Sequence, residues 1–512
     1  MIFDRLLALP DDAEPWIVDH EPIILTAHDE KVPPAAIADA AARTATALKA
    51  NGVTARSRCV VWLETPADVI VAYAAITALD AVPILISPTL DGDTLRAMVA
   101  DVADISAVVT ADDRVAECRA LLPDHRVLDW RRIAAELPSH ARFTREPEVA
   151  THATYVVVHT SGTTGVPKLV ECSGRSIRFN SWVQAGLQAC MRLRGHMAFA
   201  ISPVHGRTVV GVYGALIRRV PLLLLSDVSP DNVARMLTRH RPIFLETHPN
   251  TFRAWQHLAD RGAFRSVRFF GASFDVIHPD TIRALLSGSG HRLALCVEVY
   301  GQNESGPVAV RTHVKGFTRA TSRRGRKAVG GHPVGPRMPF CRVRIVGDDG
   351  RPVPAGSPGR ITVRTPGTFS GYLDRPGIAS RRFPTNRWWD TGDWGSISRL
   401  GRLTLIDRQV DRVTGAPSAI AAENVLLERF PELLELVVVD VDGTAWPVLS
   451  VRPGARFRRA EWDRVAPTVA RLAEPVVIPD EAFPRTVTGK IKRDRIKDLV
   501  RRLTGDGAAV DS

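Results

Sequence analysis

Short apolar runs alternate with longer amphipathic stretches in the N-terminal part of the chain. The runs CVVWL, VPILI and AVVT occupy residues 59–63, 82–86 and 107–110, and a helical pattern covers residues 66–79. Apolar runs of this length are typical of buried strands, and the stretches between them are long enough for helices. The alternation predicts βαβ units and a mostly parallel sheet.

The same alternation resumes after residue 155. The further runs lie at residues 155–159, 221–225, 243–246, 267–270 and 293–300. The longest apolar runs, such as residues 220–225, are far shorter than the ~20 residues that a membrane-spanning helix needs. We therefore expect more buried strands and no membrane insertion.

The pattern changes at residue 329. Up to residue 405, short strands alternate with Gly- and Pro-containing turns, which predicts a β-rich subdomain. After residue 408 the chain has its own strand and helix signals, and 512 residues exceed the size of one core. The expected fold class is α/β. It has a large N-terminal domain of doubly wound sheets at residues 1–407, with the β-rich subdomain at about 329–405, and a small α+β C-terminal domain at residues 408–512.

Composition places the chain among ordinary globular proteins. Hydrophobic residues make up 45% and charged residues 24%, which excludes wholesale disorder and a fibrous class. The net charge of +12 comes mostly from arginines that are spread along the chain. Because there is no clustered basic stripe and no known module, we expect no nucleic-acid partner. The charge suits an enzyme that handles a polyanion.

The cysteines and the N-terminus indicate a cytoplasmic protein. Six cysteines are scattered without CxxC or Cys/His pairing at metal-ligand spacing, which predicts buried, reduced thiols. The segment MIFDRLLALPDD lacks the charged region, the long apolar stretch and the cleavage site of a signal peptide.

A loop rich in hydroxyl groups and glycine directly follows the apolar run at residues 155–159. Glycines let the backbone bend close to a polyanion, N–H groups and hydroxyls donate to phosphate oxygens, and a lysine adds positive charge. The GxxxxGK[ST] spacing of a Walker motif is absent. The predicted phosphate-binding residues are Thr160, Ser161, Gly162, Thr163, Thr164, Gly165 and Lys168.

This loop, TSGTTGVPK, resembles the phosphate-loop signature of the adenylate-forming (AMP-binding) superfamily of acyl-CoA synthetases, peptide-synthetase adenylation domains and luciferases. Four further segments resemble signatures of this superfamily in the same order: YGQNE at 300–304, DTGDWG at 390–395, DR at 407–408 and PRTVTGKIKR at 484–493. The resemblance covers most of the chain. It implies ATP and Mg2+ as cofactors, an N-terminal AMP-binding domain and a mobile C-terminal domain.

The resemblance also implies roles for the matched residues. Glu304 would hold Mg2+, and Tyr300, next to Gly301, would stack on adenine. Asp393 would accept hydrogen bonds from the ribose hydroxyls. Lys490 would bridge the attacking carboxylate and the α-phosphate, where two anions meet and catalysis depends on positioning and positive charge.

Other positions border the nucleotide and the acid. Gly271, Ala272 and Ser273 resemble the strand end that lies beside adenine and the acyl group, and Arg408 would reach the ribose or phosphate. Asn303 replaces the usual threonine beside the Mg2+ glutamate, and its amide can still donate to a phosphate oxygen.

The segment SPVHG at residues 202–206 resembles the part of these enzymes in which an aromatic residue or a histidine gates the acyl site. His205 is therefore a candidate catalytic and substrate residue, with a plain core histidine as the alternative. Arg207 is either a cation facing an acidic or electron-rich aromatic substrate or a solvated arginine. The segment contains no aspartate to pair with an α-ammonium, so an α-amino acid substrate is disfavoured.

The hinge differs from that of the superfamily. Val410 stands in place of a polar hinge residue, and Thr414 and Pro417 lie in the hairpin, where Pro417 replaces a glycine. Because proline fixes φ and lacks an N–H, the hairpin that lines the pantetheine tunnel cannot be retained unchanged.

The predicted function is ATP-dependent adenylation of a small-molecule carboxylic acid, aryl or acyl, followed by transfer to a thiol of CoA or of an acyl carrier protein. Transfer to a non-thiol nucleophile such as an amine, including nitrite activation for diazotisation, is an alternative that the altered hinge favours. A non-catalytic nucleotide-binding sensor is the third possibility.

Overall fold

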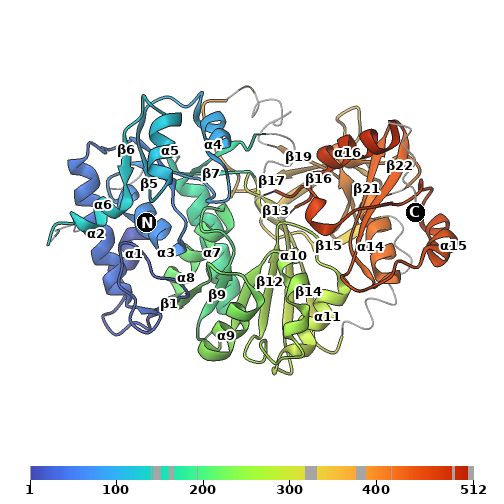
Figure 1. Cartoon of the computed structure of the whole chain (residues 1–512), viewed down its shortest axis with the longest axis horizontal. Coiled ribbons are helices and arrows are strands. Elements are labelled where there is room, and N and C mark those ends of the chain that lie inside the picture. The colour runs from blue at the N-terminus through green and yellow to red at the C-terminus, as the bar shows by residue number, and fades with distance from the viewer. Residues whose placement is uncertain are drawn as a thin grey trace.

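The computed structural model describes residues 2–139, 141, 152–160, 166–192, 194–317, 331–375, 377, 388–416, 418–486 and 490–505. Figure 1 shows the N-terminal elements, in blue and green, at one end of the molecule and the C-terminal elements, in red, at the other. Some positions with predicted roles lie outside the described residues: Ser161, Gly162, Thr163, Thr164, Gly165 and Pro417.

The first sheet has seven described strands in the order β18-β8-β7-β4-β3-β5-β6. The strands from β7 to β6 run parallel, and β8 and β18 are antiparallel additions at one edge. Their bounds are β3 (Arg58–Trp62), β4 (Val82–Leu85), β5 (Ile105–Thr110), β6 (Val127–Asp129), β7 (Thr154–His159), β8 (Leu169–Ser173) and β18 (Gly371–Tyr372). The associated helices are α1 (Ile2–Leu7), α2 (Pro34–Ala50), α3 (Pro66–Ala78), α4 (Gly92–Val99), α5 (Arg114–Leu121) and α6 (Trp130–Ala135).

The second sheet has eight strands among the described residues, in the order β14-β13-β12-β11-β9-β10-β1-β2. It is parallel from β13 to β1 and antiparallel at its two edges. The bounds are β1 (Trp16–Val18), β2 (Lys31–Val32), β9 (Met197–Ala200), β10 (Leu222–Leu224), β11 (Phe244–Thr247), β12 (Phe269–Ser273), β13 (Leu295–Gln302) and β14 (Gly306–Val314). Its helices are α7 (Gly174–Cys190), α8 (Gly206–Arg218), α9 (Pro230–His240), α10 (Pro249–Ala254) and α11 (Pro279–Gly288).

One hydrophobic core contains side chains from both sheets and from helices α2, α3 and α8. Every residue of α3 is buried, as expected for an apolar helix that is covered on all sides. The two sheets and these helices therefore form one packed unit, and the mixed α/β fold class predicted from the sequence is confirmed.

The β-rich stretch forms an antiparallel sheet with the strand order β15-β20-β19-β17-β16. Its strands are β15 (His332–Pro336), β16 (Arg342–Val346), β17 (Gly359–Arg364), β19 (Trp389–Ile397) and β20 (Arg402–Arg408). Strand β20 leads into a short 3-10 helix, η2 (Gln409–Asp411), which contains the exposed Val410.

The C-terminal segment builds a small sheet in the order β21-β22-β23. Its elements are α14 (Ala419–Arg429), β21 (Leu433–Val441), β22 (Thr444–Val451), α15 (Arg459–Val469), β23 (Val476–Val477) and α16 (Arg493–Gly505). Its hydrophobic clusters, such as the one around Phe430, Leu449 and Trp462, contain only residues from Val413 onward among those described. This sheet therefore has a core of its own.

A buried ionic cluster joins the C-terminal sheet to α10. The Arg253 guanidinium donates to the Leu433 carbonyl at 3.2 Å and lies 4.0 Å from the Glu435 carboxylate, which also accepts from Arg485 at 3.2 Å. Burial lowers the pKa of Arg253 and raises the pKa of Glu435. We call Arg253, Glu435 and Arg485 the interface cluster.

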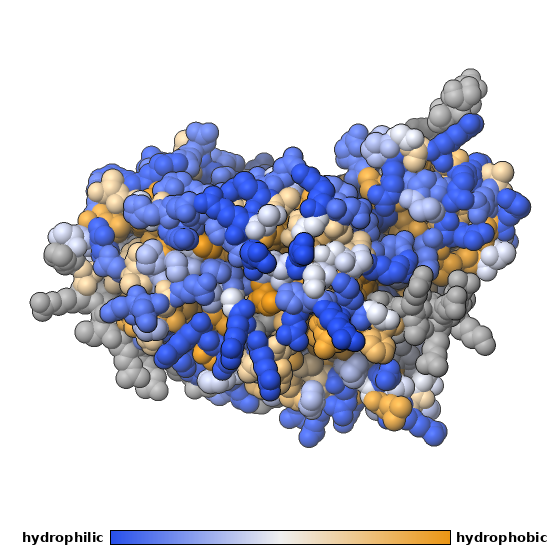
Figure 2. Space-filling view, turned by 90° about the horizontal axis from the view of Figure 1, so that it is seen from below, coloured by the Kyte–Doolittle hydropathy of each residue, from blue (hydrophilic) through white to orange (hydrophobic). Residues whose placement is uncertain are grey.

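The outer surface is mostly polar. Figure 2 shows one face on which hydrophilic side chains predominate and hydrophobic side chains form small, separated patches. None of the described helices is long and apolar enough to cross a membrane.

Asp68 connects an N-terminal loop to two helices. It lies buried in the first turn of α3, where its carboxylate accepts from the backbone amides of Ile23 and Ile24 at 3.0 and 3.1 Å. The same carboxylate accepts from the Trp130 indole at 2.9 Å and from the Thr65 hydroxyl. Four donors from three segments of the chain therefore bind one side chain.

We predict that Asp68→Ala lowers the free energy of unfolding by about 3 kcal/mol, because buried donors lose their only acceptor. Urea denaturation would measure this, with Asp39→Ala on α2 as the control. Asp39 pairs with Arg43 on the exposed helix surface, so its loss should cost about 0.5 kcal/mol or less. Equal losses in the two variants would contradict the role of Asp68.

Candidate active site

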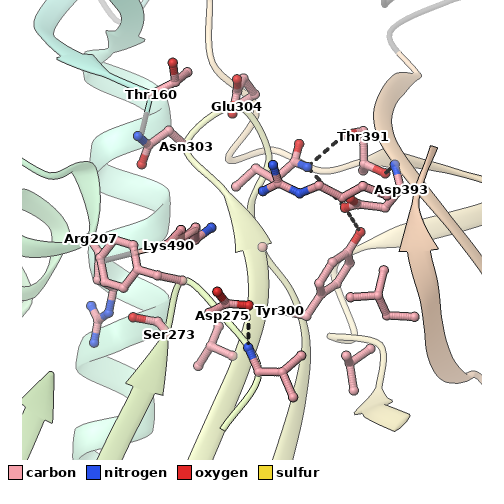
Figure 3. A pocket seen from close by; sticks show the side chains of 18 of the residues that line it. Thr160, Arg207, Ser273, Asp275, Tyr300, Asn303, Glu304, Thr391, Asp393 and Lys490 are labelled. Carbon is pink, nitrogen blue, oxygen red and sulfur yellow. Dashed lines mark hydrogen bonds between the residues drawn. The ribbon is translucent and has the colours of Figure 1, made fainter. Parts of the chain in front are cut away.

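A cavity of about 560 Å3 opens where the first three sheets meet the C-terminal segment. It is lined by residues that follow the carboxyl ends of β7, β12 and β13, where parallel sheets place their functional loops. Figure 3 shows residues from each of these strand ends pointing into the same space. Most of the described residues with a predicted role therefore come from distant parts of the chain to one cavity, whereas Gly271 and Ala272 are not among the residues that line it.

Thr160 and Lys168 close the two ends of the predicted phosphate loop. The Thr160 amide donates to the Lys168 carbonyl, and the Lys168 amide donates to the Thr160 hydroxyl, both at 3.0 Å. The loop thus connects the antiparallel strands β7 and β8 as a hairpin. The Lys168 ammonium lies 5.6 Å from the centre of the Tyr372 ring, a cation–π distance.

Glu304 is buried at the edge of the cavity beside Asn303. One of its carboxylate oxygens accepts from the Tyr372 hydroxyl at 2.8 Å. Mg2+ prefers one or two carboxylates together with phosphate oxygens and water, so a single glutamate next to a phosphate loop fits it. No cluster of three or more His, Cys, Asp or Glu ligands occurs among the described residues.

Asn303 points to the end of β7. Its side-chain amide donates to the His159 carbonyl at 3.0 Å. A Cβ on Gly206 would lie 2.9 Å from the Asn303 side-chain oxygen, so the glycine allows α8 to approach closely. Asn303 therefore binds the end of β7 and lies close to the start of α8, and one amide hydrogen is engaged before any phosphate binds.

Tyr300 and Asp393 form the opposite wall. The Tyr300 hydroxyl donates to the Asp393 carboxylate at 2.6 Å, and the Gln302 amide donates to the same oxygen at 3.2 Å. Burial, followed by the charge of Asp393, raises the pKa of Tyr300 well above its usual value. Asp393 pairs with Arg408 across strands β19 and β20, which brings both residues to the cavity.

Two glycines near the site stand where a side chain would be too close to its neighbours. A Cβ on Gly301 would lie 2.4 Å from the Gly306 carbonyl, at a bulge between β13 and β14. Gly271 faces Glu246 and Phe244, which a Cβ would approach to 3.2 and 3.0 Å. Ala272 and Ser273, which follow Gly271 on β12, are buried at the end of the strand.

Lys490 reaches the cavity from the C-terminal segment. The ends of its loop are joined by two bonds, from the Thr486 amide to the Lys490 carbonyl at 2.7 Å and from the Lys490 amide to the Thr486 hydroxyl at 3.1 Å. Burial, followed by the charge of Arg408, lowers the pKa of Lys490 to about 8. The negative charges of Asp275, Asp393 and Glu304 act in the opposite direction and raise it. Lys490 thus lies within electrostatic reach of the predicted metal and ribose residues.

His205 is buried at the start of α8. Its ring lies 5.9 Å from His159, 6.1 Å from His248 and 5.4 Å from Phe274. Burial, followed by His159, His248 and Lys490, holds the pKa of His205 well below its usual value, so the ring is neutral. His205 lines the cavity, and its Nε2 atom has no hydrogen-bond partner among the described residues.

Arg207 is not a free cation. Its Nε and Nη2 donate to the two carboxylate oxygens of Glu246, both at 2.6 Å, and the Ser273 hydroxyl donates to Glu246 at 3.3 Å. Glu246 is almost completely buried behind Arg207, which is among the residues that line the cavity. Figure 3 shows Arg207 and Ser273 on the side of the pocket away from Asp393. Glu246 was not predicted as a site residue, although its carboxylate stands in the apolar run IFLE of the sequence.

Comparison with known proteins identifies the family. A family model described as AMP-binding enzyme matches residues 25–373. The chain is 32% identical to the 3-amino-2-hydroxy-4-methoxybenzoate diazotase of Streptomyces cremeus, over 72% of this chain and 67% of that protein. It is 26% identical to a 3-aminoavenalumate diazotase of a Streptomyces species, over 81% and 72%.

Other similar proteins use a thiol. The chain is 27% identical to the indoleacetate–CoA ligase of Aromatoleum aromaticum, over 90% of this chain and 92% of that protein. Its fold matches the o-succinylbenzoate coenzyme A synthetase of Bacillus subtilis in complex with ATP and magnesium ion, with a TM-score of 0.78, 20% identity, and coverage of 97% and 99%.

The Arg207–Glu246 pair predicts a double-mutant pattern. Arg207→Leu should lower the free energy of unfolding by about 3–5 kcal/mol, because Glu246 stays buried and unpaired. Arg207→Leu combined with Glu246→Leu should recover most of that loss, since no buried charge remains. Urea denaturation of the single and double variants would test this, and equal losses would show that the pair does not govern stability.

Proposed function

Since the chain belongs to the AMP-binding enzyme family, whose members form adenylates, we propose that it activates nitrite with ATP and transfers the nitrosyl group to an aromatic amine that carries a carboxylate. The similarity to two diazotases supports this reaction class. Diazotisation transfers the activated group to an amine and not to a thiol, which is the alternative that the altered hinge around Val410 favours.

The observation that carries the proposal is the polar wall formed by Arg207 and Glu246. In an acid:thiol ligase, the substrate carboxylate itself is activated beside Lys490, and an apolar or aryl body fills the remaining pocket. Here Arg207, a guanidinium that Glu246 holds in place, is among the residues that line the pocket, and its N–H groups that Glu246 does not engage would suit a second carboxylate. Nitrite is small enough to leave this space to an aminobenzoate acceptor.

The adenylation step would use the residues gathered around the cavity. A nitrite oxygen attacks the α-phosphate, and pyrophosphate leaves with its electron pair. Lys490 would offset the negative charge where the two anions meet, and Thr160 and Lys168 would hold the phosphates. Glu304 would hold Mg2+, which neutralises phosphate charge when bound.

The nucleoside would lie against the opposite wall. Asp393 would accept hydrogen bonds from the ribose hydroxyls, and the bond from Tyr300 fixes the orientation of both side chains. The Tyr300 ring would stack on adenine, and Arg408 would reach the ribose or phosphate from the start of the C-terminal segment.

Transfer of a carboxylic acid to the thiol of CoA or of a carrier protein is the second candidate. Its support is the indoleacetate–CoA ligase, which the chain matches over nearly its whole length. The hinge argues against it, because Val410 is 58% exposed in place of a polar residue. A non-catalytic sensor is disfavoured, because Lys490, Glu304 and Asp393 share one cavity.

The pKa of Lys490 predicts a pH profile for adenylation. The lysine must be protonated to act, and with its pKa at about 8 the charged fraction falls as pH rises through that value. The kcat/KM for pyrophosphate release should therefore fall about tenfold per pH unit above the pKa. Lys490→Arg, which stays charged, should lack this fall, while Lys490→Ala should be roughly 100- to 1000-fold slower. The same fall in Lys490→Arg would assign the titration to another group.

The substrate assignment predicts that nitrite starts the reaction. With ATP, Mg2+ and an aminobenzoate, added nitrite should increase pyrophosphate release at least tenfold, whereas CoA should have no effect. Pyrophosphate release and mass spectrometry of the products would measure this, with fatty and aryl acids as comparison substrates. Rapid acyl-CoA formation from one of these acids, with no response to nitrite, would favour the thiol ligase instead.

A further inference from the structure

Asp275 is a cavity residue to which the sequence signatures give no role. It follows β12, lines the cavity, and is exposed to it. Figure 3 shows Asp275 between Ser273 and Tyr300, at the junction of the acid pocket and the nucleotide wall. Its Oδ1 accepts from the Val276 amide at 2.9 Å. In the described part of the chain, Asp275 forms no ion pair with an arginine or lysine, so its carboxylate is not neutralised by a close partner.

The backbone before Asp275 is strained. Phe274 has a φ of 83°, in the left-handed region that a bulky side chain rarely adopts. Its ring is held 4.4 Å from the His248 ring and 5.4 Å from the His205 ring. Such a conformation costs on the order of 1–3 kcal/mol and persists where surrounding contacts impose it, often at functional sites. Here it redirects the chain at the end of β12, so that the next side chain faces the cavity.

Electrostatic effects show what lies near Asp275. Burial lowers the pKa of Lys490 and of His248, and the charge of Asp275 partly offsets both effects. Burial raises the pKa of Glu423 in the C-terminal segment, and Asp275 adds to that effect. Asp275 and Lys490 line the same cavity, so Asp275 would face groups held beside that lysine. The titratable groups around it come from both the second sheet and the C-terminal segment.

We propose that Asp275 is the general base that accepts the proton of the attacking amine. This inference rests on the proposed function and assigns a residue to its second step. The amine nitrogen attacks the nitrogen of the adenylated nitrite, an N–N bond forms, and the N–O bond to phosphate breaks as AMP leaves with the electron pair. The N–H proton passes to the Asp275 carboxylate.

The same carboxyl can complete the reaction. The resulting N-nitrosamine becomes a diazohydroxide through movement of its second N–H proton to oxygen. Asp275 then returns its proton to the hydroxyl, and water leaves to give the diazonium ion. The two proton transfers balance, so no other reactant is required.

His205 is the competing base, because its neutral ring also borders the cavity. Its side chain is only 2% exposed and is enclosed by three aromatic rings, whereas Asp275 is accessible. A carboxylate also stabilises the positive charge that develops on the amine nitrogen, which a neutral imidazole does less well. The geometry therefore favours Asp275.

The test compares two products in the same reaction. With ATP, Mg2+, nitrite and 3-aminobenzoate, diazonium is measured by coupling to a naphthylamine dye, and adenylation is measured by first-turnover pyrophosphate release. Asp275→Asn should lower the ratio of diazonium to pyrophosphate by roughly 100- to 10,000-fold, the usual contribution of a general base. The exposed Asp260→Asn, as matched control, should keep the wild-type ratio.

Chemical rescue separates a base from a structural residue. Added formate should increase the rate of diazonium formation by Asp275→Ala at least tenfold, because formate can enter the space that the side chain has left. Asp275→Asn, which fills that space, should not respond. An unchanged ratio in Asp275→Asn, an equal loss of both products, or no rescue by formate would overturn the inference while the proposed function stands. A wild-type enzyme that gives neither pyrophosphate nor diazonium with nitrite would overturn both.

Discussion

The site depends on the buried ammonium of Lys490, which is held among carboxylates. Lys490 enters a cavity built by other sheets, where burial and Arg408 weaken its hold on a proton, and where Asp275, Asp393 and Glu304 strengthen it. Because these effects leave the pKa of Lys490 at about 8, its ammonium keeps its charge near neutral pH. It is also poorly solvated, so it interacts strongly with a phosphate oxygen. The glycine contacts, the Tyr300–Asp393 bond and the Glu304–Tyr372 bond all keep the surrounding groups at fixed places around it.

Much of the fold could be predicted because its strands are short apolar runs. The run at residues 155–159 became β7, and the loop that follows it connects β7 to β8 as a hairpin. Strand β1 and the edge strand β2 were not predicted, because two or three residues carry no periodic signal. β1 pairs with β10, a contact between distant segments, and β2 pairs with β1.

The site was predictable where a motif is local and not where a contact crosses elements. The positions of Glu304, Asp393 and Lys490 came from signatures, and the structure places all three at one cavity. The partner of Arg207 could not be assigned that way, since Arg207 lies in α8 and Glu246 lies on β11, 39 residues further along the chain and inside an apolar run. Asp275 gave no signal either, because its importance arises from the φ of Phe274 and from the cavity around it.

The interface cluster has a consequence for the timing of the catalytic cycle. Movement of the C-terminal sheet away from α10 would separate Arg253 from the Glu435 carboxylate and the Leu433 carbonyl, whereas Glu435 would keep its partner Arg485 in the same segment. The buried Arg253 guanidinium would then regain water, and dissolved ions would screen the charges that separate. Opening of this interface would therefore respond to ionic strength, and so would any step of turnover that requires it.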